Sequence, residues 1–175
     1  MRESEFEETL SWAEGDRIMA KEIERKFLIK GEAWRKLARG VPYRQGYLSI
    51  ARECTIRIRI IGDEGFLTIK GVTVGAARAE YEYGIPAAEA NEMLSSLCEK
   101  PLIEKNRYRI AAGPVTWEID EFGGDNQGLI VAEVELSDEK QVVDLPEWIG
   151  QEVTGDPKYF NSSLTRNPFS RWGKG

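Results

Sequence analysis

Seven segments of the sequence alternate between charged or polar residues and apolar ones, with the two-residue period of a β-strand. They are residues 21–29, 55–61, 65–70, 78–85, 104–111, 116–122 and 129–136. Successive side chains of a strand point to opposite faces, so each segment has one charged and one apolar face. Turn signals such as Gly62-Asp63 and Gly113-Pro114 separate several of them. The pattern predicts a mainly-β (α+β) fold of seven or eight antiparallel strands, forming a barrel or a sandwich.

Helices are fewer, and we expect them to pack on the outside of the sheet. The predicted helices are residues 32–39, 86–99 and 158–165. Pro86 suits the first turn of the second helix, because its missing N–H would have no partner there. Asp156 and Pro157 predict an N-cap followed by a first-turn proline in the third.

One face of the strands gathers nearly all of their charge. This face consists of Glu22, Glu24, Lys26, Arg57, Arg59, Thr68, Lys70, Glu80, Glu82, Lys105, Arg107, Arg109, Glu118, Asp120, Glu133 and Glu135. A solvated face usually mixes signs, because like charges on neighbouring positions repel. Here acidic doublets and basic clusters lie on different strands, which costs stability unless a bound ligand neutralises them. Carboxylates suit Mg²⁺, and arginine and lysine suit phosphate, so a polyphosphate with its metal ions fits both sets.

Two architectures could produce this face. A closed barrel would collect the charges on its inner wall and turn the apolar face outward, under the helices. A sandwich would bury the apolar faces and leave the charges in water. The sandwich would serve only as an interaction module, without metal dependence or phosphate binding.

The amino-acid composition excludes several classes of catalytic site and binding partner. The chain has 175 residues, no histidine, and a formal net charge of −6. The absence of histidine excludes histidine general bases, Ser-His-Asp triads and histidine-ligated zinc. The net charge argues against a nucleic-acid partner, and no apolar run is long enough for a membrane span. Two cysteines, Cys54 and Cys98, give no disulfide framework, so we expect a cytoplasmic protein.

A series of motifs along the chain resembles the CYTH superfamily, also called the triphosphate tunnel metalloenzymes. The segments are E-I-E-R-K at 22–26, T-I-R-I-R at 55–59, L-T-I-K-G at 67–71, R-A-E-Y-E at 78–82, K-N-R-Y at 105–108, W-E-I-D at 117–120, E-V-E at 133–135 and D-P-K-Y-F-N-S-S-L at 156–164. The first motif alone is a weak signal, but the whole series in this order is specific. The resemblance implies an eight-stranded antiparallel closed β-barrel over residues 20–167. It leaves residues 1–19 as an N-terminal extension and 168–175 as a tail.

The resemblance also implies the roles of individual residues. The phosphate-holding or substrate-binding residues would be Lys26, Arg57, Arg59, Lys70, Glu80, Glu82, Lys105, Arg107 and Lys158. The ligands of one or two Mg²⁺ or Mn²⁺ ions would be Glu22, Glu24, Glu118, Asp120, Glu133 and Glu135. Glu22, Glu24 and Lys26 would form the catalytic set, acting with a metal-bound water.

The resulting hypothesis is metal-dependent hydrolysis of the terminal phosphate of a triphosphate, with inorganic tripolyphosphate as the favoured substrate. Alternatives of the same fold are a class IV-type adenylate cyclase and a thiamine or nucleoside triphosphatase. A non-catalytic polyphosphate-binding module is a further alternative. Aromatic residues expected on the exterior, namely Trp34, Trp148 and Trp172, permit a homodimer.

Overall fold

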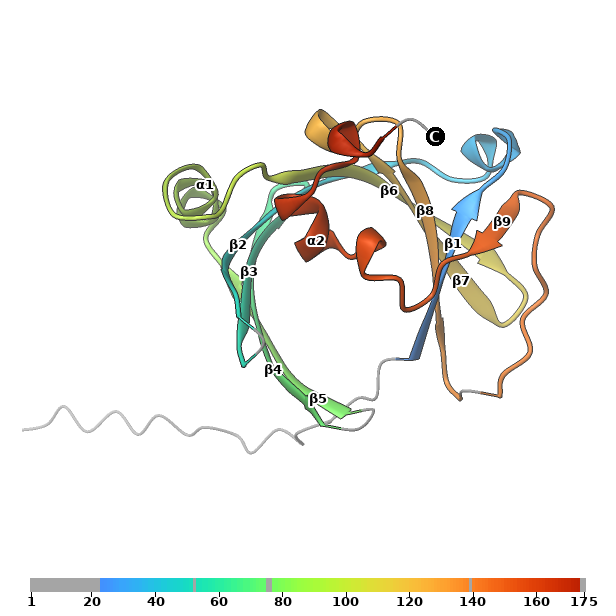
Figure 1. The fold of residues 1–175 in the computed structure, drawn as a ribbon, viewed down its shortest axis with the longest axis horizontal. Coiled ribbons are helices and arrows are strands. Elements are labelled where there is room, and N and C mark those ends of the chain that lie inside the picture. Colours follow the sequence, from blue (N-terminus) through green and yellow to red (C-terminus); the bar gives the residue numbers. More distant parts are fainter. Residues whose placement is uncertain (1–22, 52, 75–76, 139, 174–175) are drawn as a thin grey trace, which may run out of the picture.

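A computed structural model of the chain describes residues 23–51, 53–74, 77–138 and 140–173, and its strands form one antiparallel sheet curved into a ring (Figure 1). The strands are β1 (Ile23–Ile29), β2 (Val41–Ile50), β3 (Thr55–Ile61), β4 (Glu64–Val74), β5 (Ala77–Ile85), β6 (Ile103–Ala112), β7 (Val115–Phe122), β8 (Ile130–Leu136) and β9 (Ile149–Glu152). Their order in the sheet is β5-β4-β3-β2-β6-β7-β8-β1-β9. The predicted mainly-β antiparallel fold is confirmed.

The ring differs from the expected barrel in two details. It has nine strands in the described part of the chain, and two of them, β2 and β9, were not among the predicted segments. The additional strand β9 pairs with the second half of β1, through Phe27↔Glu152 and Ile29↔Ile149. Strands β5 and β9 are therefore the two edges, and hydrogen bonds between described residues do not close the ring.

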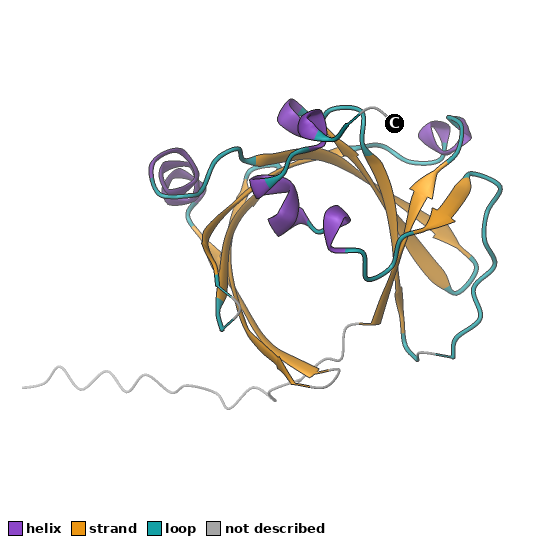
Figure 2. Ribbon diagram, viewed as in Figure 1, coloured by secondary structure: helices purple, strands orange, loops and turns teal. Residues whose placement is uncertain are grey.

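Short helices lie on both sides of the sheet. They are η1 (Ala33–Lys36), α1 (Ala87–Ser96), η2 (Gly124–Asn126), η3 (Pro157–Tyr159), α2 (Asn161–Arg166) and η4 (Phe169–Arg171). Helix α1 covers the outer face, where Ala90 and Leu94 pack against Ile58 of β3. Figures 1 and 2 show that α2 lies within the curve of the sheet instead, in contrast to the expectation that helices pack outside. Asp156 is an N-cap, since its side chain accepts a hydrogen bond from the Lys158 N–H at 3.0 Å. The predicted helix over residues 158–165 is however split at Phe160 into η3 and α2.

The main core lies on the outer face of β1, β6, β7 and β8. Phe27, Trp117 and Trp148 pack edge to face there, with ring centroids 5.5 and 5.7 Å apart. Trp34 is fully buried and Trp148 is 7% exposed, so neither supplies an exposed dimer face, contrary to the expectation from the sequence. The homodimer itself stays a prediction.

A second apolar cluster lies at one end of the ring and holds α2 in place. It consists of Ile103, Phe122, Leu129, Val131 and Leu164. Phe169 and Trp172 pack against this cluster, so the described part of the predicted tail, up to residue 173, folds back onto the domain. None of the described helices is both long and apolar enough to cross a membrane.

Candidate active site

The charged face lines a polar cavity of about 580 Å³ inside the ring. The predicted site residues on its wall are Glu24, Lys26, Arg57, Arg59, Lys70, Glu80, Glu82, Lys105, Arg107, Glu118, Glu133 and Glu135. Arg109 also lies on this wall, although its side chain is 66% exposed where it pairs with Glu118. The strand alternation therefore placed the charges on the inner side of the curved sheet, as a barrel requires and a sandwich does not.

Strands β3 to β5 form the basic half of the cavity. Arg57 donates to the Thr68 hydroxyl at 3.1 Å, and that hydroxyl donates to Glu82 at 2.8 Å. Arg59 also donates to Glu82, at 2.9 Å. Lys70 and Glu80 form an ion pair of 2.6 Å beside them.

Both arginines of this half retain unused hydrogen-bonding capacity. The Nε atoms of Arg57 and Arg59 are buried and have no acceptor among the described residues. Nearly all buried N–H groups in proteins have a partner, so an unpaired one suggests an acceptor that is absent here. A phosphate oxygen is an acceptor suited to an arginine.

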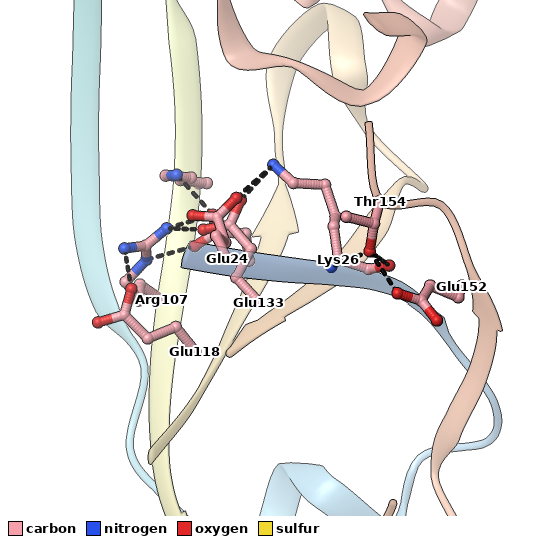
Figure 3. Close-up of polar contacts among 9 residues, drawn as sticks. Glu24, Lys26, Arg107, Glu118, Glu133, Glu152 and Thr154 are labelled. Carbon is pink, nitrogen blue, oxygen red and sulfur yellow. Dashed lines mark hydrogen bonds and ion pairs between the residues drawn. The ribbon is translucent and has the colours of Figure 1, made fainter. Parts of the chain in front are cut away.

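Strands β1, β7 and β8 form the acidic half. Glu24 lies directly opposite Glu135 across β1 and β8, and Glu118 lies opposite Glu133 across β7 and β8. Lys26 lies between these carboxylates, 2.6 Å from Glu133 and 3.3 Å from Glu24, as Figure 3 illustrates. Burial and the nearby Glu133 together raise the pKa of Glu24, although Lys26 acts against the shift. The acidic half therefore holds more negative charge than its own lysine balances.

Arg107 of β6 lies at the border of the acidic half and pairs with its carboxylates. Its guanidinium donates to Glu118, to both oxygens of Asp120 at 2.6 and 2.7 Å, and to Glu133 at 3.0 Å (Figure 3). Burial opposes the charged form, but these three carboxylates raise the pKa of Arg107 further above its ordinary value. The guanidinium is thus a fixed positive charge beside the acidic doublets.

Two predicted site residues that the structure describes, Asp120 and Lys158, do not lie on the cavity wall. Asp120 is completely buried behind it, in ion pairs with Lys105 at 2.5 Å and Arg107 at 2.6 Å. Burial alone would raise the pKa of Asp120, but the two cations lower it. Lys158 stacks on Trp172, with Nζ 4.0 Å from the ring centroid, in a separate pocket. Glu22, like residues 1–19, lies outside the described residues.

Other residues on the wall were not among the substrate-binding or metal-binding residues expected from the sequence. They are Gln45, Tyr47, Thr55, Phe160, Asn161 and Ser162. Gln45 and Tyr47 belong to β2, which the strand pattern did not reveal. The N-cap and first turn of α2 contribute Phe160, Asn161 and Ser162. The sequence predicted this helix on the outside of the sheet, but it lies inside the ring. Because Gln45 and Tyr47 are two residues apart, strand alternation would have placed both on one face if β2 had been recognised as a strand.

The acidic half suits a divalent cation. Four carboxylates, from Glu24, Glu118, Glu133 and Glu135, face one cavity as oxygen donors, the ligands that Mg²⁺ and Mn²⁺ prefer. In the described part of the chain, no three carboxylates stand close enough together to hold an ion, and Lys26 and Arg107 balance their charge instead. The donor set fits, provided that side chains rearrange when an ion binds.

Comparison with known proteins establishes the family. Residues 20–166 match the model of the CYTH domain, so the chain belongs to the CYTH family. It is 53% identical to the inorganic triphosphatase of Acetivibrio thermocellus over 154 residues, covering 88% of this chain and 99% of the relative. It is 38% identical to the inorganic triphosphatase of Nitrosomonas europaea over 148 residues, covering 82% and 95%. The crystal structure of the inorganic triphosphatase NE1496 superimposes with a TM-score of 0.62 at 36% identity, over 84% of this chain and 95% of that one.

Proposed function

We propose that this chain is a divalent-metal-dependent inorganic triphosphatase, which hydrolyses tripolyphosphate to pyrophosphate and orthophosphate. The observation that carries the proposal is one cavity with a basic half and an acidic half, in which the buried Nε atoms of Arg57 and Arg59 have no acceptor among the described residues. The relatives named inorganic triphosphatase, similar over nearly their whole length, support the same activity. Inorganic tripolyphosphate is favoured because, of the described residues on the wall, only Tyr47 and Phe160 are aromatic, which leaves little surface to stack an organic group.

The basic residues of the cavity would hold the substrate. Arg57 and Arg59 offer planar donor groups for phosphate oxygens, and Lys26, Lys70 and Lys105 offer point charges. Glu82 and Glu80 would keep Arg59 and Lys70 in position through their ion pairs. Lys158 would join this set only after leaving its contact with Trp172.

The acidic residues would hold one or two Mg²⁺ or Mn²⁺ ions. We assign Glu24, Glu118, Glu133 and Glu135 to this set, together with Glu22 from the sequence motif. A bound ion would neutralise phosphate charge and lower the pKa of a bound water, the nucleophile for the terminal phosphorus. Asp120 would instead act by positioning Lys105 and Arg107, because both of its oxygens already accept from those side chains.

The reaction needs no nucleophile from the protein. Water adds its oxygen to the terminal phosphorus, the bond to the bridging oxygen breaks, and pyrophosphate leaves. Arg107 would remain positively charged throughout, so it can stabilise the negative charge that develops on the transferred group. We also propose a cytoplasmic location, in keeping with the two free cysteines, Cys54 and Cys98.

Substrate profiling tests the proposal. Purified protein would receive tripolyphosphate, ATP, thiamine triphosphate or pyrophosphate, with Mg²⁺, Mn²⁺ or EDTA, while orthophosphate and cyclic AMP are measured. We expect orthophosphate from tripolyphosphate at the highest kcat/KM, and none in EDTA. Cyclic AMP as the main product from ATP would instead identify a cyclase. Tight tripolyphosphate binding without turnover under any metal would identify a non-catalytic binding module.

A further inference from the structure

A buried tyrosine and a buried glutamine form a neutral pair in the wall of the charged cavity. Gln45 and Tyr47 lie two residues apart on β2, so both side chains point into the ring. Gln45 is 1% exposed and Tyr47 is 5% exposed. The Gln45 amide donates to the Tyr47 hydroxyl over 3.2 Å. This bond fixes the orientation of the phenol.

The pair stands where the two halves of the cavity meet. Strand β2 separates the basic strands β3 to β5 from β6 and the acidic strands beyond it. In the register of β2 and β3, Gln45 lies opposite Arg59 and Tyr47 lies opposite Arg57. A polyphosphate that reaches from the basic half to the acidic half therefore passes over Tyr47.

The hydroxyl proton of Tyr47 is uncommitted. The oxygen accepts from Gln45, and among the described residues no acceptor takes the proton that it can donate. Arg59 and Lys26, by comparison, each already form an ion pair with a carboxylate, Arg59 with Glu82 and Lys26 with Glu133, although the Nε of Arg59 remains unpaired. Tyr47 thus presents a directed donor to the cavity without breaking an existing ion pair.

Burial raises the pKa of Tyr47 above its ordinary value of 10.0, although Arg57 and Lys26 act in the opposite direction. The phenol consequently keeps its proton at neutral and mildly alkaline pH. A neutral donor also has a smaller desolvation cost in a buried wall than a further charge would have. The chemistry of the group therefore suits donation to an anionic oxygen.

We propose that the Tyr47 hydroxyl donates a hydrogen bond to a phosphoryl oxygen in the middle of the bound polyphosphate chain, and that Gln45 is its positioning residue. This inference rests on the proposed function, because it names a further contact of the same site. It adds an uncharged specificity element to a site otherwise built from charges.

The expected effect follows from the kind of contact. Tyr47→Phe removes the hydroxyl and keeps the ring, so the tripolyphosphate affinity should fall about 3- to 10-fold, the usual range for one hydrogen bond. If the contact is present in both ground and transition states, KM rises and kcat stays unchanged. General loosening of the site would lower kcat as well. Gln45→Met, which leaves the phenol without its positioning bond, should have the same effect to a smaller degree.

Calorimetric titration of tripolyphosphate into the full chain in EDTA tests the contact without turnover. The variants are Tyr47→Phe, Gln45→Met and the control Tyr83→Phe, which makes the same change on the outer face of β5, where Tyr83 is 54% exposed. Weaker binding by Tyr47→Phe, with Tyr83→Phe equal to wild type, would support the inference. Equal binding by Tyr47→Phe and wild type would overturn it.

Two further outcomes are distinguishable. If wild type itself fails to bind tripolyphosphate, with or without Mg²⁺, the proposed function fails and the contact fails with it. If thermal melts show that Tyr47→Phe is unfolded, Gln45→Met decides: weaker binding supports the inference, and wild-type affinity overturns it.

Discussion

Lys26 and Glu133 face each other across β1 and β8, with the lysine Nζ 2.6 Å from the carboxylate Oε1. In the proposed function, Lys26 binds phosphate and Glu133 binds the metal ion, so the contact joins the two sets of binding residues. Burial would lower the pKa of Lys26, but Glu133 and Glu24 raise it above its ordinary value. Before ligands bind, the two future binding sets therefore neutralise each other. Metal and polyphosphate would replace these internal partners with external ones.

Glu24→Gln should abolish most metal-dependent turnover and leave the fold intact. The amide keeps the shape of the side chain but supplies a weaker, neutral ligand, so metal affinity should fall by at least about 10-fold. Titration of Mn²⁺ and steady-state kinetics across metal concentrations measure the effect.

The matched control for this variant is Glu152→Gln. Glu152 carries the same functional group, but it pairs with Arg25 away from the cavity, through contacts of 2.7 and 2.9 Å. Its turnover should equal that of wild type. Undiminished turnover in Glu24→Gln would refute the metal assignment.

The same pair of variants should change stability in opposite directions. The pKa of Glu24 is raised above 4.5, so its contribution to stability is complete below pH 4.5 and is lost as pH rises through the folded value. Glu24→Gln should therefore melt higher than wild type at pH 8 without metal, and the difference should vanish near pH 4.

The contribution of Glu152 to stability depends on pH in the opposite direction. Its hydrogen bonds from Arg25 lower its pKa to about 2, so its stabilisation is present above pH 4.5 and disappears as pH falls toward 2. Glu152→Gln should melt slightly lower than wild type at pH 8. Thermal melts of the three proteins between pH 4 and 8 check both signs, and a lower melting point for Glu24→Gln at pH 8 would contradict the first.

Asp120→Asn should destabilise the protein strongly. The carboxylate is completely buried between Lys105 and Arg107, and removal of its charge takes away the carboxylate that pairs with Lys105 and one of the three that pair with Arg107. Breaking a buried ion pair costs about 3–5 kcal/mol, which lowers Tm by roughly 6–20 °C in a domain of this size. Asp63→Asn, in the exposed turn between β3 and β4, should change Tm little. Differential scanning calorimetry compares them, and a Tm near wild type for Asp120→Asn would be inconsistent with a positioning role.

Arg59→Ala should weaken substrate capture. Its side chain is only 16% exposed and its Nε lacks an acceptor among the residues described, so it has a free donor for phosphate. Loss of one charge-assisted hydrogen bond should raise KM for tripolyphosphate about 10- to 100-fold. Arg166→Ala, an arginine that is 60% exposed and paired with Glu99, is the control. Equal KM values for the two variants would remove Arg59 from the substrate set.

Strand alternation predicted most of the sheet, but it did not predict β2. Pro42 and Gly46 interrupt the pattern of β2, and both normally argue against a strand interior. A Cβ at Gly46 would lie 2.7 Å from side-chain atoms of Cys98 and Leu102, so close packing excludes a larger residue there. This glycine is required by tertiary contacts, which the local sequence pattern does not reveal.

The alternation of each strand likewise predicted which face a charged residue lies on. It did not predict whether the side chain is exposed to the cavity or buried. Glu118 and Asp120 share one face of β7, yet Glu118 lines the cavity while Asp120 is buried behind Lys105 and Arg107. Which of the two meets the ligand depends on the register of β6 against β7, where Arg107 lies opposite Asp120. Sequence spacing within one strand carries no information about that register.

The pairing of β1 with β8 has a consequence for how the protein is made. Lys26 and Glu133 are separated by 107 positions in the chain, so β1 leaves the ribosome well before β8 and must wait for it before the two can pair. Such distant pairing is a slow step in folding, because a long loop must close first. Glu24 and Glu135 therefore come together only after β8 has been made, and metal capture by this pair would report that β1 and β8 have paired.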